Sequence, residues 1–124
     1  MDGLKQVMEY APNVDYRELY PKFTDADTKL YMYQLFKALD QMHSKGIMHR
    51  DIKPHNVAYD PKTKSLKLID FGLSEFYLPG VPLSLRVSSQ YYKPPEIVLE
   101  FGGYDFSMDI WAVGCIFASI VRLS

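Results

Sequence analysis

Four side chains in two short stretches carry the functional groups needed to move a phosphoryl group. Asp51, Lys53 and Asn56 supply a carboxylate, an amine and a carboxamide, and Asp70 supplies a second carboxylate before a Phe-Gly pair. One carboxylate can orient an attacking hydroxyl and accept its proton, while the amine neutralises charge on the phosphate. The carboxamide and the other carboxylate offer the hard oxygen ligands that magnesium prefers.

The order of these residues is more specific than any one of them. Residues 49–56 have the sequence His-Arg-Asp-Ile-Lys-Pro-His-Asn, and residues 70–72 are Asp-Phe-Gly. This order matches the protein-kinase signature, whereas an Asp-Phe-Gly alone is common by chance and often marks a turn. Under the alternative interpretation, Arg50 and Lys53 are solvated surface charges and His55 is a loop residue without a role.

Composition and charge restrict the class of protein. The 124 residues suffice for one small domain or for part of a larger one, and a hydrophobic content of 48% favours a folded core over disorder. The net charge of −1 argues against nucleic acid or an anionic membrane as a partner. Cys115 is the single cysteine, so we expect a small buried apolar residue and neither a disulfide nor a cysteine zinc site.

Two further features concern the compartment. The sequence does not open with a basic segment followed by an apolar run, so we expect no signal peptide. Residues 110–121 are the most apolar run, which is too short for a bilayer and predicts a buried helix. We therefore expect a reducing compartment inside the cell: the cytoplasm, the nucleus or both.

The first elements are short. An Asp-Gly turn precedes a predicted strand over residues 4–10. Pro12 lies just beyond this strand and ends it. Asp15 can cap a short helix that continues through Tyr20 and ends at Pro21.

The longest helical pattern begins at Thr24, which with Asp27 forms a capping box, and continues to about Ser44. Gly46 ends it, as a glycine past a helix end usually does. Apolar residues at intervals of three and four predict its buried face: Met32, Leu35, Phe36, Leu39 and Met42.

Two short strands, residues 56–59 and 66–69, are predicted to form a hairpin through the turn at 60–64. Asn56 and Asp70 then lie at its two ends and point to one place. These positions are what a shared magnesium site requires.

The second half of the chain is less regular. Residues 72–95 show no sustained period and predict a long loop of the kind that is usually functional. Glu96 starts a short helix. Ser107 is predicted to cap a last helix over residues 108–121, whose apolar residues on nearly all sides make it the most buried element.

Taken together, these motifs resemble the lower, C-terminal lobe of a eukaryotic protein kinase, a mostly helical α+β fold. The Lys-Pro pair after Asp51 is similar to serine/threonine kinases rather than tyrosine kinases. Three runs resemble the catalytic (alpha) subunit of casein kinase II: His-Asn-Val at 55–57, Ser-Glu-Phe-Tyr-Leu-Pro-Gly at 74–80 and Arg-Val-Ser-Ser-Gln-Tyr-Tyr-Lys at 86–93. The segment at 30–48, which ends in His-Ser-Lys-Gly-Ile-Met, resembles the same family.

The resemblance implies roles for individual catalytic residues. Asp51 corresponds to the catalytic base, and Lys53 to the lysine that contacts the phosphate. Asn56 and Asp70 correspond to the magnesium ligands. Ser89 corresponds to the activation-segment hydroxyl that bonds to the catalytic loop. Separately, Asp109 corresponds to a buried aspartate that braces the backbone of that loop, whose free N–H groups need an acceptor.

The resemblance also implies a nucleotide site for ATP, or possibly GTP, with Mg²⁺. The hinge that holds the purine would be Glu9, Tyr10 and Ala11, with Met8 behind it. Ala58, Ile69 and Asp70 would line the other side. The family's partners are protein substrates with acidic residues near the acceptor and a regulatory beta subunit, without nucleic acid or membrane.

Some positions depart from the family. Phe71 replaces a tryptophan, Gln90 replaces an arginine near the acceptor site, and Pro94 replaces a glycine. The sequence contains no Gly-rich phosphate loop, no Val-Ala-Ile-Lys lysine and no helix glutamate to pair with it. We therefore expect residues 1–124 to be a partial kinase domain that is inactive alone, with the hinge, catalytic loop, activation segment and following helix. The alternative is a truncated, non-catalytic kinase-like module that only binds partners.

Overall fold

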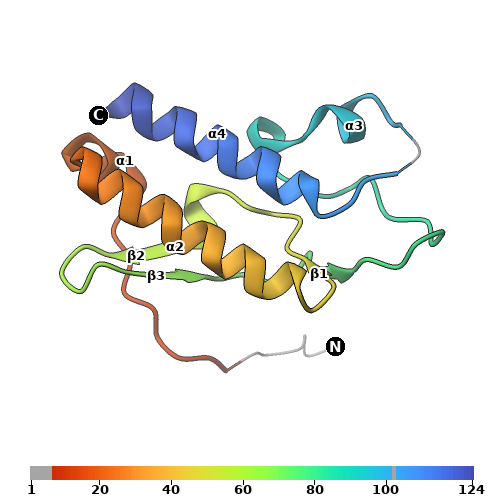
Figure 1. Ribbon diagram of the computed structural model, residues 1–124, viewed down its shortest axis with the longest axis horizontal. Coiled ribbons are helices and arrows are strands. Elements are labelled where there is room, and N and C mark those ends of the chain that lie inside the picture. The colour runs from red at the N-terminus through yellow and green to blue at the C-terminus, as the bar shows by residue number, and fades with distance from the viewer. Residues whose placement is uncertain (1–6, 102) are drawn as a thin grey trace, which may run out of the picture.

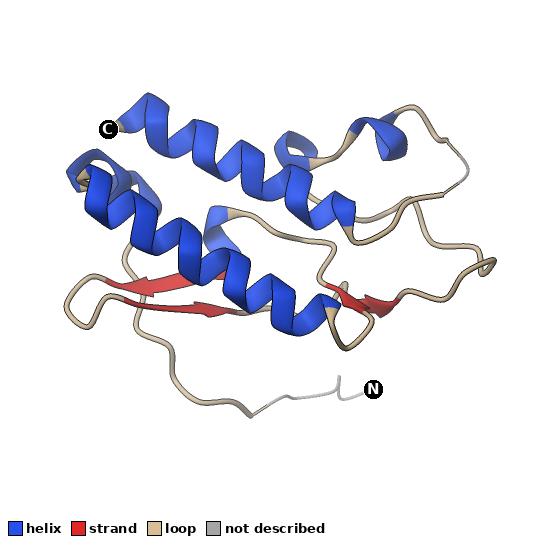
Figure 2. Cartoon of the chain, viewed as in Figure 1, coloured by secondary structure: helices blue, strands red, loops and turns tan. Residues whose placement is uncertain are grey.

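The computed structural model describes residues 7–101 and 103–124 and is built around two long helices (Figure 1). Helix α2 (Asp25–His43) packs against helix α4 (Ser107–Leu123) and also against the hairpin of β2 (Val57–Asp60) and β3 (Ser65–Leu68). A second small sheet pairs β1 (Ile47–Met48) with β4 (Glu75–Phe76). In the view of Figure 2, both sheets lie on the side of α2 away from α4. The predicted class, α+β and mostly helical, is confirmed.

Helix α2 begins as its sequence predicts. The backbone N–H of Asp27 donates to Thr24 Oγ1 at 3.2 Å, and the N–H of Thr24 donates to Asp27 Oδ2 at 3.1 Å. These reciprocal bonds form a capping box. At the other end Gly46 adopts a φ of +76°, which glycine reaches at low cost.

The buried face of α2 differs from the predicted stripe. Tyr31, Leu35 and Leu39 are almost fully buried, whereas Phe36 is 45% exposed. The buried three are spaced by four residues, so they form one row along the helix. Phe36 follows Leu35 directly and lies about 100° around the axis, which places it at the edge of the contact.

We expect Thr24→Ala to lower the free energy of unfolding by about 1 kcal/mol, because the N–H of Asp27 loses its acceptor. Thr24→Ser keeps the hydroxyl and is the matched control. Urea titration of both variants measures the effect, and equal losses in the two would contradict a capping role.

The Thr24 bond, followed by the bond from Lys64, lowers the pKa of Asp27 to about 2. The stabilisation that the Asp27 carboxylate gives to the start of α2 is therefore fully present above the ordinary Asp pKa. This stabilisation is lost as the pH falls towards 2.

The β2–β3 hairpin is antiparallel, with Val57 opposite Leu68 and Asp60 opposite Ser65. Strand β2 lies one residue later than the predicted 56–59, and β3 lies one residue earlier than the predicted 66–69. The later start of β2 comes from a 3₁₀ turn, Pro54–Asn56, which takes Asn56 out of the strand.

Two predictions about the first elements are wrong. Residues 4–6 of the predicted first strand lie outside the described residues, and residues 7–10 have no regular structure, since no strand is paired with them there. Pro21 does not end α1 (Tyr16–Leu19) but lies in a 3₁₀ turn, Tyr20–Lys22, where its missing N–H costs little. Asp15 does cap α1, accepting a bond from the N–H of Arg17 at 2.8 Å.

Ser107 is the first residue of α4 rather than its cap. Its N–H donates to Asp105 Oδ1 at 2.8 Å, so the aspartate two residues earlier satisfies it. The long segment predicted as a loop, 72–95, contains β4 and a 3₁₀ turn, Gln90–Tyr92. Neither is long enough to show a period in the sequence. The next short helix, α3, is Pro95–Val98.

Two clusters of buried apolar side chains form the core, and α4 contributes to both. The first includes Ala112, Val113, Ile116 and Ile120 of α4 together with the buried faces of α2 and the hairpin. The second surrounds Met108 in the first turn of α4, with Met48, Val87, Ile97 and Tyr104. Helix α4 therefore contributes to both clusters and connects them.

The outer face of α4 is exposed, so the prediction that it is the most buried element is wrong. Ile110, Trp111, Phe117 and Val121 are each between 44% and 60% exposed. Cys115, predicted to be buried, is only partly covered, although burial raises the pKa of its thiol and keeps it protonated. No helix in the described part of the chain is long and apolar enough to cross a membrane.

Candidate active site

A buried carboxylate from α4 holds the backbone of the loop that carries residues 49–56. Asp109 is 1% exposed, and its two oxygens accept bonds from the N–H groups of His49 and Arg50, both at 2.9 Å. His43 Nε2 lies 2.8 Å from the same carboxylate. These contacts fix the start of the loop against the helix, as expected for Asp109.

Arg50 has a φ of +67°, a conformation that a residue with a side chain adopts only at a cost. In this conformation the N–H of Arg50 donates to Asp109, and the guanidinium of Arg50 makes two further hydrogen bonds. Its Nε donates to the carbonyl of Leu73 at 2.6 Å, and its Nη1 donates to the hydroxyl of Tyr104 at 3.0 Å. Arg50 is 8% exposed, so the interpretation as a solvated surface charge is wrong.

Three side chains converge on the carboxylate of Asp51. Ser89 Oγ donates to Asp51 Oδ1 at 2.9 Å, and Asn56 Nδ2 donates to Asp51 Oδ2 at 3.0 Å. Lys53 Nζ lies 3.4 Å from Oδ2 and donates to Ser89 Oγ at 3.0 Å. The four residues come from the catalytic loop and from the segment before α3. The carboxylate is therefore kept in one orientation and beside a positive charge.

Asp70 lies just beyond β3, between two residues that contact His49. The carbonyl of Ile69 is 3.1 Å from His49 Nε2, and the rings of Phe71 and His49 are 5.3 Å apart. Asp70 has a φ of +59°, and its Oδ1 accepts a bond from the N–H of Gly72 at 3.2 Å. A Cβ at Gly72 would lie 3.1 Å from that oxygen, so glycine leaves the carboxylate room.

A hollow of about 280 Å³ separates residues 9–12 from the outer side of the hairpin. Its wall includes Glu9 and Ala11 on one side and Ala58 on the other. Glu9 Oε1 and Lys67 Nζ are 2.8 Å apart and join the two sides, and this pairing lowers the pKa of Glu9. Of the predicted nucleotide-binding residues, Met8, Ile69 and Asp70 are not among those that line this hollow.

A family model of the protein kinase domain matches residues 2–123. The chain belongs to the protein kinase family. Kinases of this family generally use ATP and Mg²⁺ to phosphorylate proteins. The match does not distinguish among subfamilies.

The kinase loop offers oxygen ligands that fit magnesium. The two hydrogen bonds that the Asn56 side chain makes with described residues both use its nitrogen, to the carboxylate and the carbonyl of Asp51, which leaves its oxygen available to a cation. Asp70 supplies an exposed carboxylate. Within residues 7–101 and 103–124, no group of three His, Cys, Asp or Glu residues could hold a metal. Phosphate oxygens and water usually complete the coordination of a protein-bound Mg²⁺.

Two residues of the kinase site were not predicted as site residues from the sequence. His43 was assigned only to the end of a helix, although it contacts Asp109 across 66 positions. Tyr104 was given no role, although it accepts a bond from Arg50 across 54 positions. The one feature of the sequence that could have indicated a role for Tyr104 was its position shortly before the helix that carries Asp109. His55, in contrast, is exposed with its ring against Tyr16, as expected for a loop residue.

Proposed function

We propose that this chain is the C-terminal-lobe part of a serine/threonine kinase similar to the catalytic subunit of casein kinase II. It contributes to transfer of the γ-phosphoryl group of ATP, or possibly GTP, to protein hydroxyls. The observation that carries the proposal is the set of contacts that Ser89, Asn56 and Lys53 make with Asp51. A cytoplasmic or nuclear location and a regulatory beta subunit belong to the same proposal.

In this proposal Asp51 accepts the proton of the attacking hydroxyl and holds that hydroxyl in line with the phosphate. The bond from Ser89 occupies one carboxylate oxygen and keeps the group from rotating. Lys53 places its ammonium between Asp51 and the incoming phosphate, where it offsets developing negative charge. Asn56 and Asp70 would hold magnesium, which supplies further neutralisation of the phosphate oxygens. The hollow between residues 9–12 and Ala58 would receive the purine.

Acidic substrates are the second part of the proposal. Arg86 and Lys93 flank Ser89 in the sequence, and Lys53 Nζ donates to Ser89 Oγ at 3.0 Å. Arg86 is exposed and both lysines are partly exposed, so each charge contributes little individually and is screened by salt. Gln90 stands where the resembled family has an arginine, which weakens the preference.

The test uses the protein expressed from its complete coding sequence, with labelled ATP, Mg²⁺ and paired peptides. One peptide of each pair carries Asp and Glu after the acceptor serine, and the other carries Asn and Gln. We expect phosphoserine to form, faster with the acidic peptide, and the difference to shrink as salt is raised. Equal rates at low salt would reject the acidic preference, and no phosphoserine would reject the kinase proposal.

A non-catalytic, partner-binding module is the second candidate function. The exposed apolar side chains on the outer face of α4 favour it, because contiguous apolar surface usually marks an interaction site. The same assay separates the two candidates: the module transfers no phosphate to any of the peptides, whereas the kinase does.

A further inference from the structure

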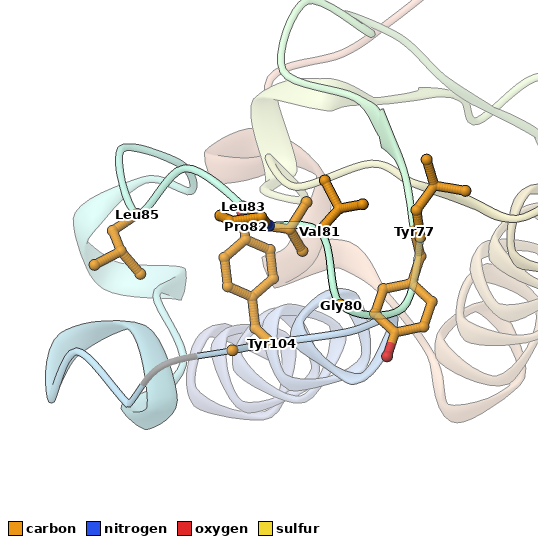
Figure 3. Close-up of a pocket in the computed structure, with 9 residues that line it drawn as sticks. Tyr77, Gly80, Val81, Pro82, Leu83, Leu85 and Tyr104 are labelled. Carbon is orange, nitrogen blue, oxygen red and sulfur yellow. The ribbon is translucent and has the colours of Figure 1, made fainter.

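The segment 77–85 lies between β4 and the residues around the acceptor site, and it borders two hollows at the surface. A hollow of about 350 Å³ separates it from Gly103 and Tyr104 (Figure 3), and another of about 230 Å³ separates it from Arg50. Both hollows are lined by the same four residues of the segment: Leu78, Val81, Pro82 and Leu83. Tyr77 and Leu83 pack on the buried cluster of Met108, whereas Leu78, Val81 and Pro82 are exposed, so side-chain packing secures only part of this segment.

A chain of hydrogen bonds through one hydroxyl connects the segment to the catalytic loop. The hydroxyl of Tyr104 donates to the carbonyl of Ser84 at 2.5 Å and accepts from Arg50 Nη1 at 3.0 Å. The close-up shows the Tyr104 ring reaching from the loop before α4 toward Pro82 and Leu83 (Figure 3). The ring is 6% exposed and belongs to the buried cluster of Met108, so its position is itself well defined.

Arg50 depends on this hydroxyl. Its guanidinium is buried, and the ion pairs found among the described residues do not include it. Its two acceptors, the Leu73 carbonyl and the Tyr104 hydroxyl, are both neutral. A hydrogen bond to a buried charge is among the stronger ones, and leaving such a charge without its acceptor is costly. The Tyr104 hydroxyl therefore stabilises the side chain next to Asp51 and the backbone at Ser84 together.

We propose that Tyr104 is a positioning residue for the acceptor side of the active site. It holds Ser84, five residues before the serine whose hydroxyl bonds to Asp51, and it holds Arg50, the neighbour of Asp51. Val87, two residues beyond the segment, lies in the buried cluster with Tyr104, which continues the connection toward Ser89. The expected effect of Tyr104 on phosphorylation rests on the proposed kinase function. The claim that Tyr104 holds Ser84 and Arg50 in place does not depend on that function.

The test compares Tyr104→Phe with Tyr77→Phe in the protein expressed from its complete coding sequence. Tyr77 lines the same hollow and packs on Phe106, and no hydrogen bond of its hydroxyl is found among the described residues. Each variant keeps its ring, so packing is preserved in both. Amide hydrogen exchange of residues 77–85 is measured first, without substrate. We expect it to be about tenfold faster in Tyr104→Phe and unchanged in Tyr77→Phe, since local opening follows the lost bonds.

Peptide phosphorylation is measured next. We expect Tyr104→Phe to raise the KM for peptide about tenfold with a smaller effect on the KM for ATP, because the described residues that line the hollow proposed for the purine do not belong to segment 77–85. Unchanged exchange in Tyr104→Phe, or the same increase in Tyr77→Phe, would overturn the positioning role. Equal increases of both KM values would also overturn it. If the unaltered protein transfers no phosphate, the kinase proposal fails, while the exchange measurement still decides whether Tyr104 holds the segment.

Discussion

Asp51→Asn is expected to reduce phosphoryl transfer by about 10²- to 10⁴-fold, the range that a positioned general base contributes. The amide cannot accept the proton of the attacking hydroxyl. It also places an N–H₂ group where the carboxylate now accepts bonds from Ser89 and Asn56. Initial rates with peptide and Mg-ATP, measured on the protein expressed from its complete coding sequence, give the size of the loss.

The control is Asp40→Asn, which removes a carboxylate from the exposed side of α2. It should leave both the rate and the thermal midpoint unchanged, since surface substitutions away from special contacts have small effects. If Asp51→Asn retained the original rate, the carboxylate would have no part in the transfer and the assignment of the base would be lost.

Asp109→Asn is expected to lower the free energy of unfolding by about 3–5 kcal/mol. The residue is buried, and its oxygens accept from two backbone N–H groups and contact His43. An asparagine of the same shape presents an N–H₂ group to at least one donor, which leaves a buried N–H without an acceptor. Chemical denaturation monitored by circular dichroism measures the change.

Asp105→Asn provides the comparison for that loss. Asp105 is exposed and accepts a bond from the N–H of Ser107, and asparagine can accept the same bond. Its change in stability should stay within about 0.5 kcal/mol. Similar losses in the two variants would show that removing any negative charge near the start of α4 destabilises the protein. The loss in Asp109→Asn would then not come from its contacts with the catalytic loop.

The sequence predicted well those features that depend on neighbouring residues. The capping box at Thr24, the cap at Asp15 and the end of α2 at Gly46 each involve a few adjacent positions, and each was found. The hairpin was predicted because its two strands and turn are contiguous. The bounds of each strand differ from the prediction by one residue, and β2 starts later because the 3₁₀ turn at Pro54 extends through Asn56.

Features set by distant contacts could not be predicted in the same way. The pairing of β1 with β4 joins residues 47–48 to 75–76, and strands of two residues have no measurable period. The Arg50–Tyr104 bond joins two side chains that only the tertiary fold brings together. The Asp51–Ser89 contact was expected only through resemblance to kinases, because nothing local in either segment indicates it.

The outer face of α4 shows the limit of reasoning from composition. A helix that is apolar on all sides is normally buried on all sides. In the described chain, α2 and the two clusters cover only one side of α4, so Trp111 and Phe117 remain about half exposed. A hollow of about 650 Å³ lies along this face between Glu96 and Ala118.

Trp111 gives that exposed face an optical signal of its own. It is the single tryptophan of the chain, and it lines the hollow along α4 while remaining 49% exposed. Indole emission shifts to shorter wavelength when water leaves its surroundings, and excitation at the red edge of the spectrum avoids the ten tyrosines. The emission maximum of the unlabelled protein therefore reports whether this face is wet or covered, without a dye or an added label.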